Sequence, residues 1–209
     1  MIKAIIFDFD GTLVDSVKSI WKEYRRVMSI MGLRKVTYRE FTRHLGRPWD
    51  QVLKSMWPDV DIKEFNSHYK LDAETVKPIK DVSTALEKLN GKYALAILTS
   101  RGEHSLKIHM QNAGLKPGLF QAIQHKDNLK NHKPHPDAIK DTCSKLGVAI
   151  GEVVYVGDSI IDAECAKSAH AKFIGVLSGS ASEKEFKACG ADYIIKTMAE
   201  LPVLLSLMR

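Results

Sequence analysis

The sequence is poor in cysteine and has no long apolar run. Its three cysteines, Cys143, Cys165 and Cys189, are odd in number and widely separated. This spacing argues against a disulfide framework and a cysteine metal site, and it favours a reducing compartment. No apolar stretch approaches the roughly 20 residues that span a bilayer, and the first residues lack the pattern of a signal peptide. These absences exclude a disulfide-rich secreted scaffold and predict a cytoplasmic protein with no membrane partner.

Positive charge is unevenly distributed along the chain. An apolar fraction of 44% and a charged fraction of 27% are ordinary for a globular protein, and the formal net charge is +6. Residues 18–47 hold two acidic residues and nine basic ones: Lys18, Lys22, Arg25, Arg26, Arg34, Lys35, Arg39, Arg43 and Arg47. Such a surface attracts anions, from small phosphates to nucleic acid, but we expect most of these side chains simply to face solvent on helices. No nucleic-acid-binding motif accompanies the charge.

Strand and helix patterns alternate along the chain, with one helical interruption. Apolar runs predict strands at 2–7, 93–98, 122–124, 153–156, 172–176 and 193–195. Helices are predicted at 81–89, 102–113, 136–146, 160–168, 182–189 and 198–208, the first with Asp81 as its N-cap. From about 15 to 76 only helical periodicity is present, broken at Gly32, 46–48 and Pro58. We therefore predict an α/β fold: a doubly wound parallel sheet from residues 1–14 and 79–209, interrupted at 15–78 by a helical insert.

Polar side chains follow three of the predicted strands at the point where each ends. Asp8 and Asp10 follow the first strand, Thr99 and Ser100 follow the second, and Asp158 follows the strand at 153–156. In open α/β sheets, ligands bind just beyond the carboxyl ends of the strands. The sequence therefore predicts that these side chains meet in one pocket.

The carboxylates of this pocket suit phosphoryl transfer. Asp8 can attack phosphorus and form an aspartyl-phosphate, while Asp10 protonates the leaving oxygen and later deprotonates water. Asp8 and Asp158 supply the hard oxygen ligands that Mg²⁺ prefers. Asp162 lies one helical turn after Asp158, so we expect it to orient the metal's waters or Lys133.

Hydrogen-bond donors and cations complete the expected pocket. Thr99 or Ser100 can donate to a phosphoryl oxygen, and Lys133, in a Pro-rich loop, offsets the negative charge. Arg47 lies in the break between predicted helices, where it is expected to contact the leaving group and to favour a carboxylate or a second phosphate. The residues predicted to bind substrate are Gly11, Thr12, Arg47, Ser100 and Arg101.

Four segments of the chain resemble the motifs of the haloacid dehalogenase-like hydrolases. They are Asp8-Phe9-Asp10-Gly11-Thr12-Leu13-Val14-Asp15-Ser16, Leu98-Thr99-Ser100, Lys133-Pro134-His135-Pro136 and Gly157-Asp158-Ser159-Ile160-Ile161-Asp162. The resemblance implies a Rossmann-like core, Mg²⁺ dependence and an insert that forms a small cap domain. It also implies that Asp8 is the nucleophile, Asp10 is the acid/base with its backbone carbonyl on the metal, and Asp158 is a metal ligand. Within the family the chain is most similar to the phosphoglycolate phosphatase-like branch.

Two positions depart from the family's usual pattern. His170 stands where glycine usually permits a left-handed helix end, which is expected to affect stability more than catalysis. Ser100-Arg101 follows Thr99 where relatives often have Asn after the Thr, so these side chains are expected to alter contacts to the substrate.

Two residues favour a phosphatase over other activities of the same family. Asp10 argues against carbon–halogen cleavage, because the family's dehalogenases lack this second aspartate, and Trp49 stands where sugar-phosphate mutases often have Arg. We predict hydrolysis of a small phosphorylated metabolite, phosphoglycolate first, by a monomer or homodimer. A pyrophosphatase, a nucleotide or sugar phosphatase, and a phosphate-responsive binding protein without turnover are the alternatives.

Overall fold

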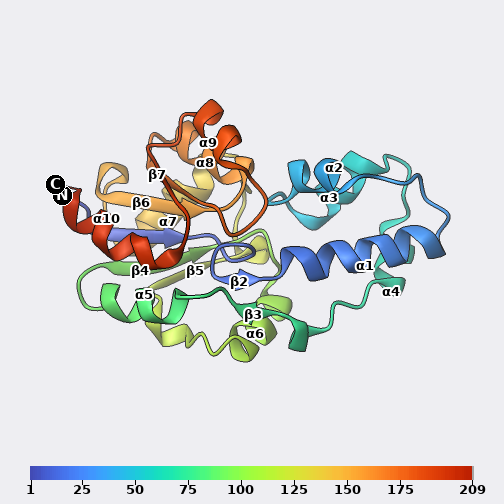
Figure 1. Ribbon diagram of the computed structural model, residues 1–209, viewed down its shortest axis with the longest axis horizontal. Coiled ribbons are helices and arrows are strands. Elements are labelled where there is room, and N and C mark those ends of the chain that lie inside the picture. Colours follow the sequence, from blue (N-terminus) through green and yellow to red (C-terminus); the bar gives the residue numbers. More distant parts are fainter. Residues whose placement is uncertain (209) are drawn as a thin grey trace.

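A six-stranded parallel sheet forms the centre of the protein (Figure 1). The computed structural model describes residues 1–208. The strands are β1 (Ala4–Phe7), β4 (Ala94–Leu98), β5 (Ala122–Gln124), β6 (Val153–Gly157), β7 (Lys172–Val176) and β8 (Tyr193–Ile195). Their order is β5-β4-β1-β6-β7-β8, and every neighbouring pair is parallel. All six predicted strands are present, and the predicted α/β fold is confirmed.

Helices cover both faces of the sheet. One face carries α5 (Val82–Leu89), α6 (Glu103–Asn112) and α10 (Leu201–Leu207), and the other carries α7 (Asp137–Leu146), α8 (Ile160–Ala169) and α9 (Glu183–Cys189). Successive residues of a strand point to opposite faces, so Ile5 and Phe7 pack with the first group while Ala4 and Ile6 pack with the second. Burial on both faces explains why β1 is apolar throughout.

Four helices form the predicted insert, which lies beyond the carboxyl ends of the strands (Figure 1). They are α1 (Val17–Ile30), α2 (Tyr38–His44), α3 (Trp49–Met56) and α4 (Ile62–His68). They share an apolar cluster of their own, in which Tyr24 packs against Phe41 and Phe65. A short antiparallel pair, β2 (Val14–Asp15) and β3 (Lys77–Pro78), lies where the chain leaves and re-enters the sheet region. Neither of these two strands is predicted from the sequence.

Several short segments differ from their predicted form. The helix predicted at 198–208 is divided into the 3₁₀ turn η5 (Met198–Glu200) and α10. Four further 3₁₀ turns are η1 (Ala73–Thr75), η2 (Pro117–Leu119), η3 (Lys126–Asn128) and η4 (Ile150–Glu152). Within residues 1–208, no helix is both long and apolar enough to cross a bilayer.

Two helix ends have a residue other than glycine in the left-handed backbone conformation. Asp81 occupies the N-cap position of α5 as predicted, but its φ is 69° and its side chain accepts no hydrogen bond from the helix. A capping side chain requires the extended backbone that Asp81 does not adopt. His170 ends α8 with a φ of 57°, as predicted for a residue that replaces the usual glycine.

Candidate active site

The carboxyl ends of three adjacent strands bring the predicted site residues together. β1 lies between β4 and β6, so Asp8, Thr99 and Asp158 follow neighbouring strands. All three residues are buried. They line one cavity of about 530 Å³, together with Asp10 and Lys133. The predicted common pocket is therefore present, between the ends of the strands and the insert.

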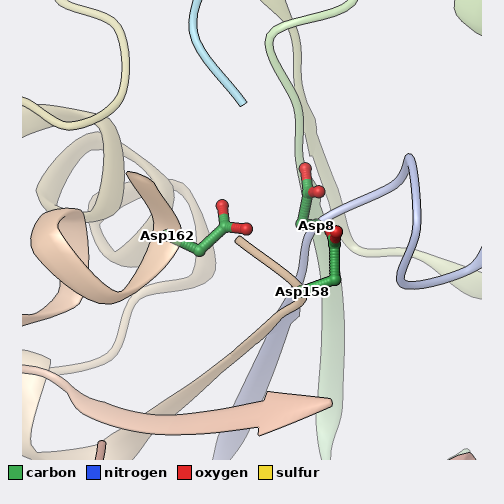
Figure 2. Close-up of side chains that lie close together, drawn as sticks. All are labelled: Asp8, Asp158 and Asp162. Carbon is green, nitrogen blue, oxygen red and sulfur yellow. The ribbon is translucent and has the colours of Figure 1, made fainter. Parts of the chain in front are cut away.

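Three buried carboxylates gather at one side of this cavity. Figure 2 shows the carboxylates of Asp8 and Asp158 side by side, with that of Asp162 approaching from α8. One oxygen from each lies within 4.8 Å of the others. The Lys133 ammonium donates hydrogen bonds to Asp8 Oδ1 at 2.7 Å and to Asp162 Oδ1 at 2.8 Å. Three carboxylates therefore share one lysine, which leaves an excess of negative charge when all are ionised.

This excess charge perturbs the titration of the site. Burial raises the pKa of Asp8 well above its usual range, although Lys133 opposes the shift. Burial and the neighbouring Asp162 raise the pKa of Asp158 to about 7. Burial lowers the pKa of Lys133, but the two carboxylates that it contacts outweigh burial and hold its pKa above the ordinary value. A divalent cation with a preference for hard oxygen ligands would balance this cluster, so the residues present fit Mg²⁺.

Asp162 has little capacity left for a direct metal bond. Its Oδ1 accepts from Lys133 and from the Tyr155 hydroxyl at 2.6 Å. Its Oδ2 accepts from the Ser159 amide at 3.1 Å and from the Ser159 hydroxyl at 2.6 Å. Asp162 therefore orients Lys133, which is one of the two roles expected from the sequence.

Gly11 and Thr12 contact Asp158 and do not line the cavity. Gly11 has a φ of +82°, and a Cβ there would lie 2.5 Å from an Asp158 carboxylate oxygen. The Thr12 hydroxyl is 3.4 Å from Asp158 Oδ1, and the Ser180 amide donates to Oδ2 at 2.7 Å. The turn after β1 thus directs both residues towards Asp158, and their contact with substrate stays a prediction.

Asp10 forms a partly buried ion pair with Arg101. Arg101 Nε donates to Asp10 Oδ2 at 3.0 Å, Nη2 pairs with Oδ1, and the Ser16 hydroxyl donates to the same oxygen. Arg101 Nη1 donates to the Ser105 hydroxyl at 2.7 Å and lies 3.2 Å from His109 Nδ1. Burial raises the pKa of Asp10, but the guanidinium outweighs burial and places that pKa below its usual value. Arg101, predicted to bind substrate, lines the cavity but has its guanidinium engaged by Asp10.

Further polar contacts join the insert to the core beside the cavity. The Ser100 hydroxyl donates to the Gly46 carbonyl and so joins the end of β4 to the loop before α3, and Ser100 also lines the cavity. Lys126 Nζ donates to Asp50 Oδ1 at 2.9 Å. Arg47 lines the cavity, and its buried Nε has no hydrogen-bond partner within residues 1–208. The expected contact of Arg47 with an anionic substituent stays a prediction, and its unpartnered Nε is consistent with it.

Comparison with known proteins places the chain in a family. The model of the haloacid dehalogenase-like hydrolases matches residues 5–176, and the chain belongs to this family. It is 29% identical to a phosphoglycolate phosphatase of Aquifex aeolicus over 184 residues, which cover 85% of each chain. It is 29% identical to a phosphorylated carbohydrates phosphatase of Thermotoga maritima, covering 97% of this chain and 98% of the relative. The enzyme class expected from the motifs, a phosphoric monoester hydrolase, agrees with these relatives.

Two further comparisons extend over nearly the whole chain. A pyrophosphatase PpaX of Bacillus pumilus is 25% identical over 205 residues, which cover 96% of this chain and 94% of the relative. The crystal structure of a hydrolase from Pseudomonas syringae superimposes with a TM-score of 0.87 at 23% identity, covering 99% of each chain. The second of these supports the fold alone.

Sequence reasoning missed several residues that support the carboxylates. Ser16 lies at the end of the first motif, and its hydroxyl donates to Asp10. Tyr155 is the one residue with a polar group in an otherwise apolar strand, and this signal could have indicated its contact with Asp162. Ser180 acts through its backbone amide, which carries no sequence signal.

Proposed function

We propose that the protein is a Mg²⁺-dependent phosphatase that hydrolyses small phosphate monoesters through an aspartyl-phosphate on Asp8. One observation carries the proposal: Asp8 lines a cavity together with Asp158, within 4.8 Å of it, while Lys133 holds Asp8 Oδ1 at 2.7 Å. A nucleophile, acidic metal ligands and a fixed cation are the parts that phosphoryl transfer requires.

The metal-binding residues of this proposal are Asp8, Asp158 and the backbone carbonyl of Asp10. The two side chains are supported by the excess negative charge of the cluster, and the carbonyl by the family resemblance. Mg²⁺ in this position supplies positive charge to the phosphoryl oxygens and to the carboxylates. The saturated hydrogen bonds of Asp162 favour its role as an orienting residue over direct ligation.

The chain's own groups can carry both halves of the reaction. In the first half, Asp8 Oδ2 attacks phosphorus, the bond to the leaving oxygen breaks, and Asp10 gives that oxygen a proton. In the second half, Asp10 takes a proton from water, the water oxygen attacks phosphorus, and inorganic phosphate leaves Asp8. Thr99 Oγ1 accepts from the Arg101 amide at 3.1 Å, so its own hydrogen is free to contact a phosphoryl oxygen. Arg101 stabilises the ionised Asp10 that the second half requires.

Phosphoglycolate is the first substrate to test. Relatives carry this name, and Arg47 offers an unpaired cation to its carboxylate. Pyrophosphate is the second candidate, because Arg47 would also contact a second phosphate and another relative carries that name. The insert at 15–78 would act as a cap that excludes bulk water when it closes over the cavity.

Phosphate release from a panel of esters, with and without Mg²⁺, tests the proposal. We expect Mg²⁺-dependent release by the native protein and none by Asp8→Asn. Asp141→Asn, an exposed substitution of the same kind on α7, should retain activity. Rapid quenching followed by mass spectrometry should find the phosphate adduct on Asp8. Absence of Asp8-dependent release from every ester would favour the binding protein over the enzyme.

A further inference from the structure

We propose that the leaving group of the natural substrate carries an apolar ring, which binds between the insert and α6. This inference rests on the proposed phosphatase function, because it concerns the same cavity. It goes beyond that function by ranking ring-bearing esters above phosphoglycolate. The size of the cavity, the composition of its wall and the pairing of its cations carry the argument.

The wall that faces the catalytic carboxylates is mainly apolar. It is supplied by α1, α3, the segment after α4, and α6, all of which lie beside the carboxyl ends of the strands. Its apolar and aromatic side chains include Ile20, Tyr24, Trp49, Val52, Tyr69 and Ile108. Substrate pockets combine such walls with a few polar groups that fix orientation. Here the polar groups include the carboxylates and Lys133, where the phosphoryl group would bind, and Arg47 on the insert.

The cavity is too large for phosphoglycolate alone. Its volume of about 530 Å³ lies within the range typical of pockets for larger organic ligands. Phosphoglycolate has about nine non-hydrogen atoms, and at roughly 30 Å³ for each displaced water it would fill at most about half of this space. The remainder would hold water against apolar side chains. A ring attached to the leaving oxygen would displace that water and gain the free energy of apolar burial.

Aromatic packing gives this wall a fixed shape. Tyr24 and Trp49 meet edge to face with ring centroids 5.1 Å apart, and Trp49 and Tyr69 do so at 4.4 Å. Trp49 Nε1 also donates to Asn66 Oδ1 at 2.8 Å, which holds the indole in place. Rigid aromatic side chains lose little conformational entropy when a ligand binds. The wall is therefore prepared for a flat or compact apolar group.

The charges on the cavity disfavour the two other classes of leaving group. Aromatic clusters can bind quaternary ammonium groups, but the unpaired Arg47 on the cavity wall disfavours a second cation beside it. A leaving group made mainly of phosphate would need several unpaired cations. Lys133, Arg101 and Lys126 are already paired with carboxylates, and only Arg47 among the cavity's lysines and arginines has no such partner within residues 1–208. A single cation suits one polar substituent on a largely apolar group.

Hydrolysis of matched alkyl esters tests the inference. Ethyl phosphate and 2-phenylethyl phosphate release alcohols of similar basicity, so that their difference reports the ring and not the chemistry of the leaving oxygen. We expect kcat/KM to be about 10- to 100-fold higher for 2-phenylethyl phosphate than for ethyl phosphate, the gain typical of burying one aromatic side chain. It should also exceed kcat/KM for phosphoglycolate.

A charge placed on the apolar wall provides the matched variant. Ile108 lines the cavity from α6 and is 37% exposed, so Ile108→Asp should fold. We expect it to lower the ratio of the two kcat/KM values by about 10-fold. Gln111→Asp places the same charge on an exposed part of α6 outside the cavity wall, and it should leave the ratio unchanged.

The outcomes separate the inference from the proposed function. Asp8-dependent release with equal kcat/KM for ethyl and 2-phenylethyl phosphate would overturn the ring and leave the phosphatase in place. If no ester is hydrolysed, the phosphatase fails, and calorimetric titration of the same two esters then decides the inference. Binding of 2-phenylethyl phosphate no tighter than that of ethyl phosphate would overturn it. Tighter binding, weakened by Ile108→Asp and not by Gln111→Asp, would support it.

Discussion

Replacing Lys133 by methionine should destabilise the metal-free protein, most strongly in alkaline solution. The ammonium group contacts Asp8 at 2.7 Å and Asp162 at 2.8 Å, and the lysine side chain is 1% exposed. Methionine has a similar length but no charge. The variant would therefore leave Asp8, Asp158 and Asp162 facing one another with no cation among them.

The expected loss of stability follows from the distances of the Lys133 ammonium to Asp8 and Asp162. At an effective dielectric constant of about 20, each contact of Lys133 contributes roughly 6 kcal/mol of Coulomb attraction. Part of this loss is offset, because the variant no longer buries an ammonium group, and that desolvation costs several kcal/mol. We expect a net loss of about 3–5 kcal/mol, as is usual when one partner of a buried pair is removed. For a domain of this size that loss lowers Tm by roughly 6–20 °C.

The pH dependence distinguishes lost charge from lost packing. Burial and Asp162 raise the pKa of Asp158 to about 7 in the folded protein, whereas an aspartate in the unfolded chain has a pKa of about 4. Protonated Asp158 therefore stabilises the folded protein fully below pH 4, and this stabilisation is lost as the pH rises through 7. Without Lys133 the repulsion among the carboxylates is stronger. The deficit of the variant should therefore be larger near pH 8 than near pH 5, where protonation relieves the repulsion.

Urea unfolding in a chelator, near both pH values, measures this deficit. Lys130→Met, an exposed substitution in the same loop, is the matched control and should have little effect. Mg²⁺ at about 100 times its Kd should restore roughly 2.7 kcal/mol to the Lys133 variant. An equal deficit near both pH values, with no recovery in Mg²⁺, would refute the electrostatic reasoning.

Three further predictions concern neighbouring groups. Gly11→Ala should lower stability by about 1–3 kcal/mol and reduce phosphate release, because φ at this position is +82° and the new Cβ would lie 2.5 Å from an Asp158 carboxylate oxygen. A Tm and an activity equal to those of the native protein would contradict this prediction. Arg101→Met should raise the pKa of Asp10, because the guanidinium that lowers it is removed. The alkaline limb of the pH profile of kcat/KM, which requires protonated Asp10, should then move to higher pH, and an unchanged profile would exclude Asp10 as the general acid. Arg47→Ala should reduce kcat/KM about 10-fold more for phosphoglycolate than for ethyl phosphate, and equal reductions would show that Arg47 contacts no anionic substituent.

Local sequence patterns were sufficient to predict most of the elements. The apolar run before Asp8 becomes β1, which is completely buried, and the run before Thr99 becomes β4. The predicted meeting of Asp8, Thr99 and Asp158 followed from one rule, that parallel strands direct their carboxyl ends to the same edge. The prediction needed only the position of each residue after its strand, and it did not depend on the strand order.

Conformations that depend on a few backbone angles were harder to predict. Asp81 has a residue type suited to an N-cap, but the turn before α5 places it at a φ of 69°. The pair of β2 and β3 is formed by two segments of two residues each, which are too short for any periodicity to indicate. Both features depend on how the insert joins the sheet, and local composition does not specify that geometry.

The sequence by itself determined which residue types stand at the ends of the strands, and hence the class of chemistry. Only the tertiary structure decided which of them meet. Asp10 and Arg101 are 91 residues apart and pair because β1 and β4 are neighbours in the sheet. The helical spacing of Tyr24 predicts a core residue, and Tyr24 is buried. It also forms part of the cavity wall, which the spacing does not indicate. Periodicity shows which side of a helix is buried, whereas the packing of other elements decides whether that side meets a side chain or a substrate.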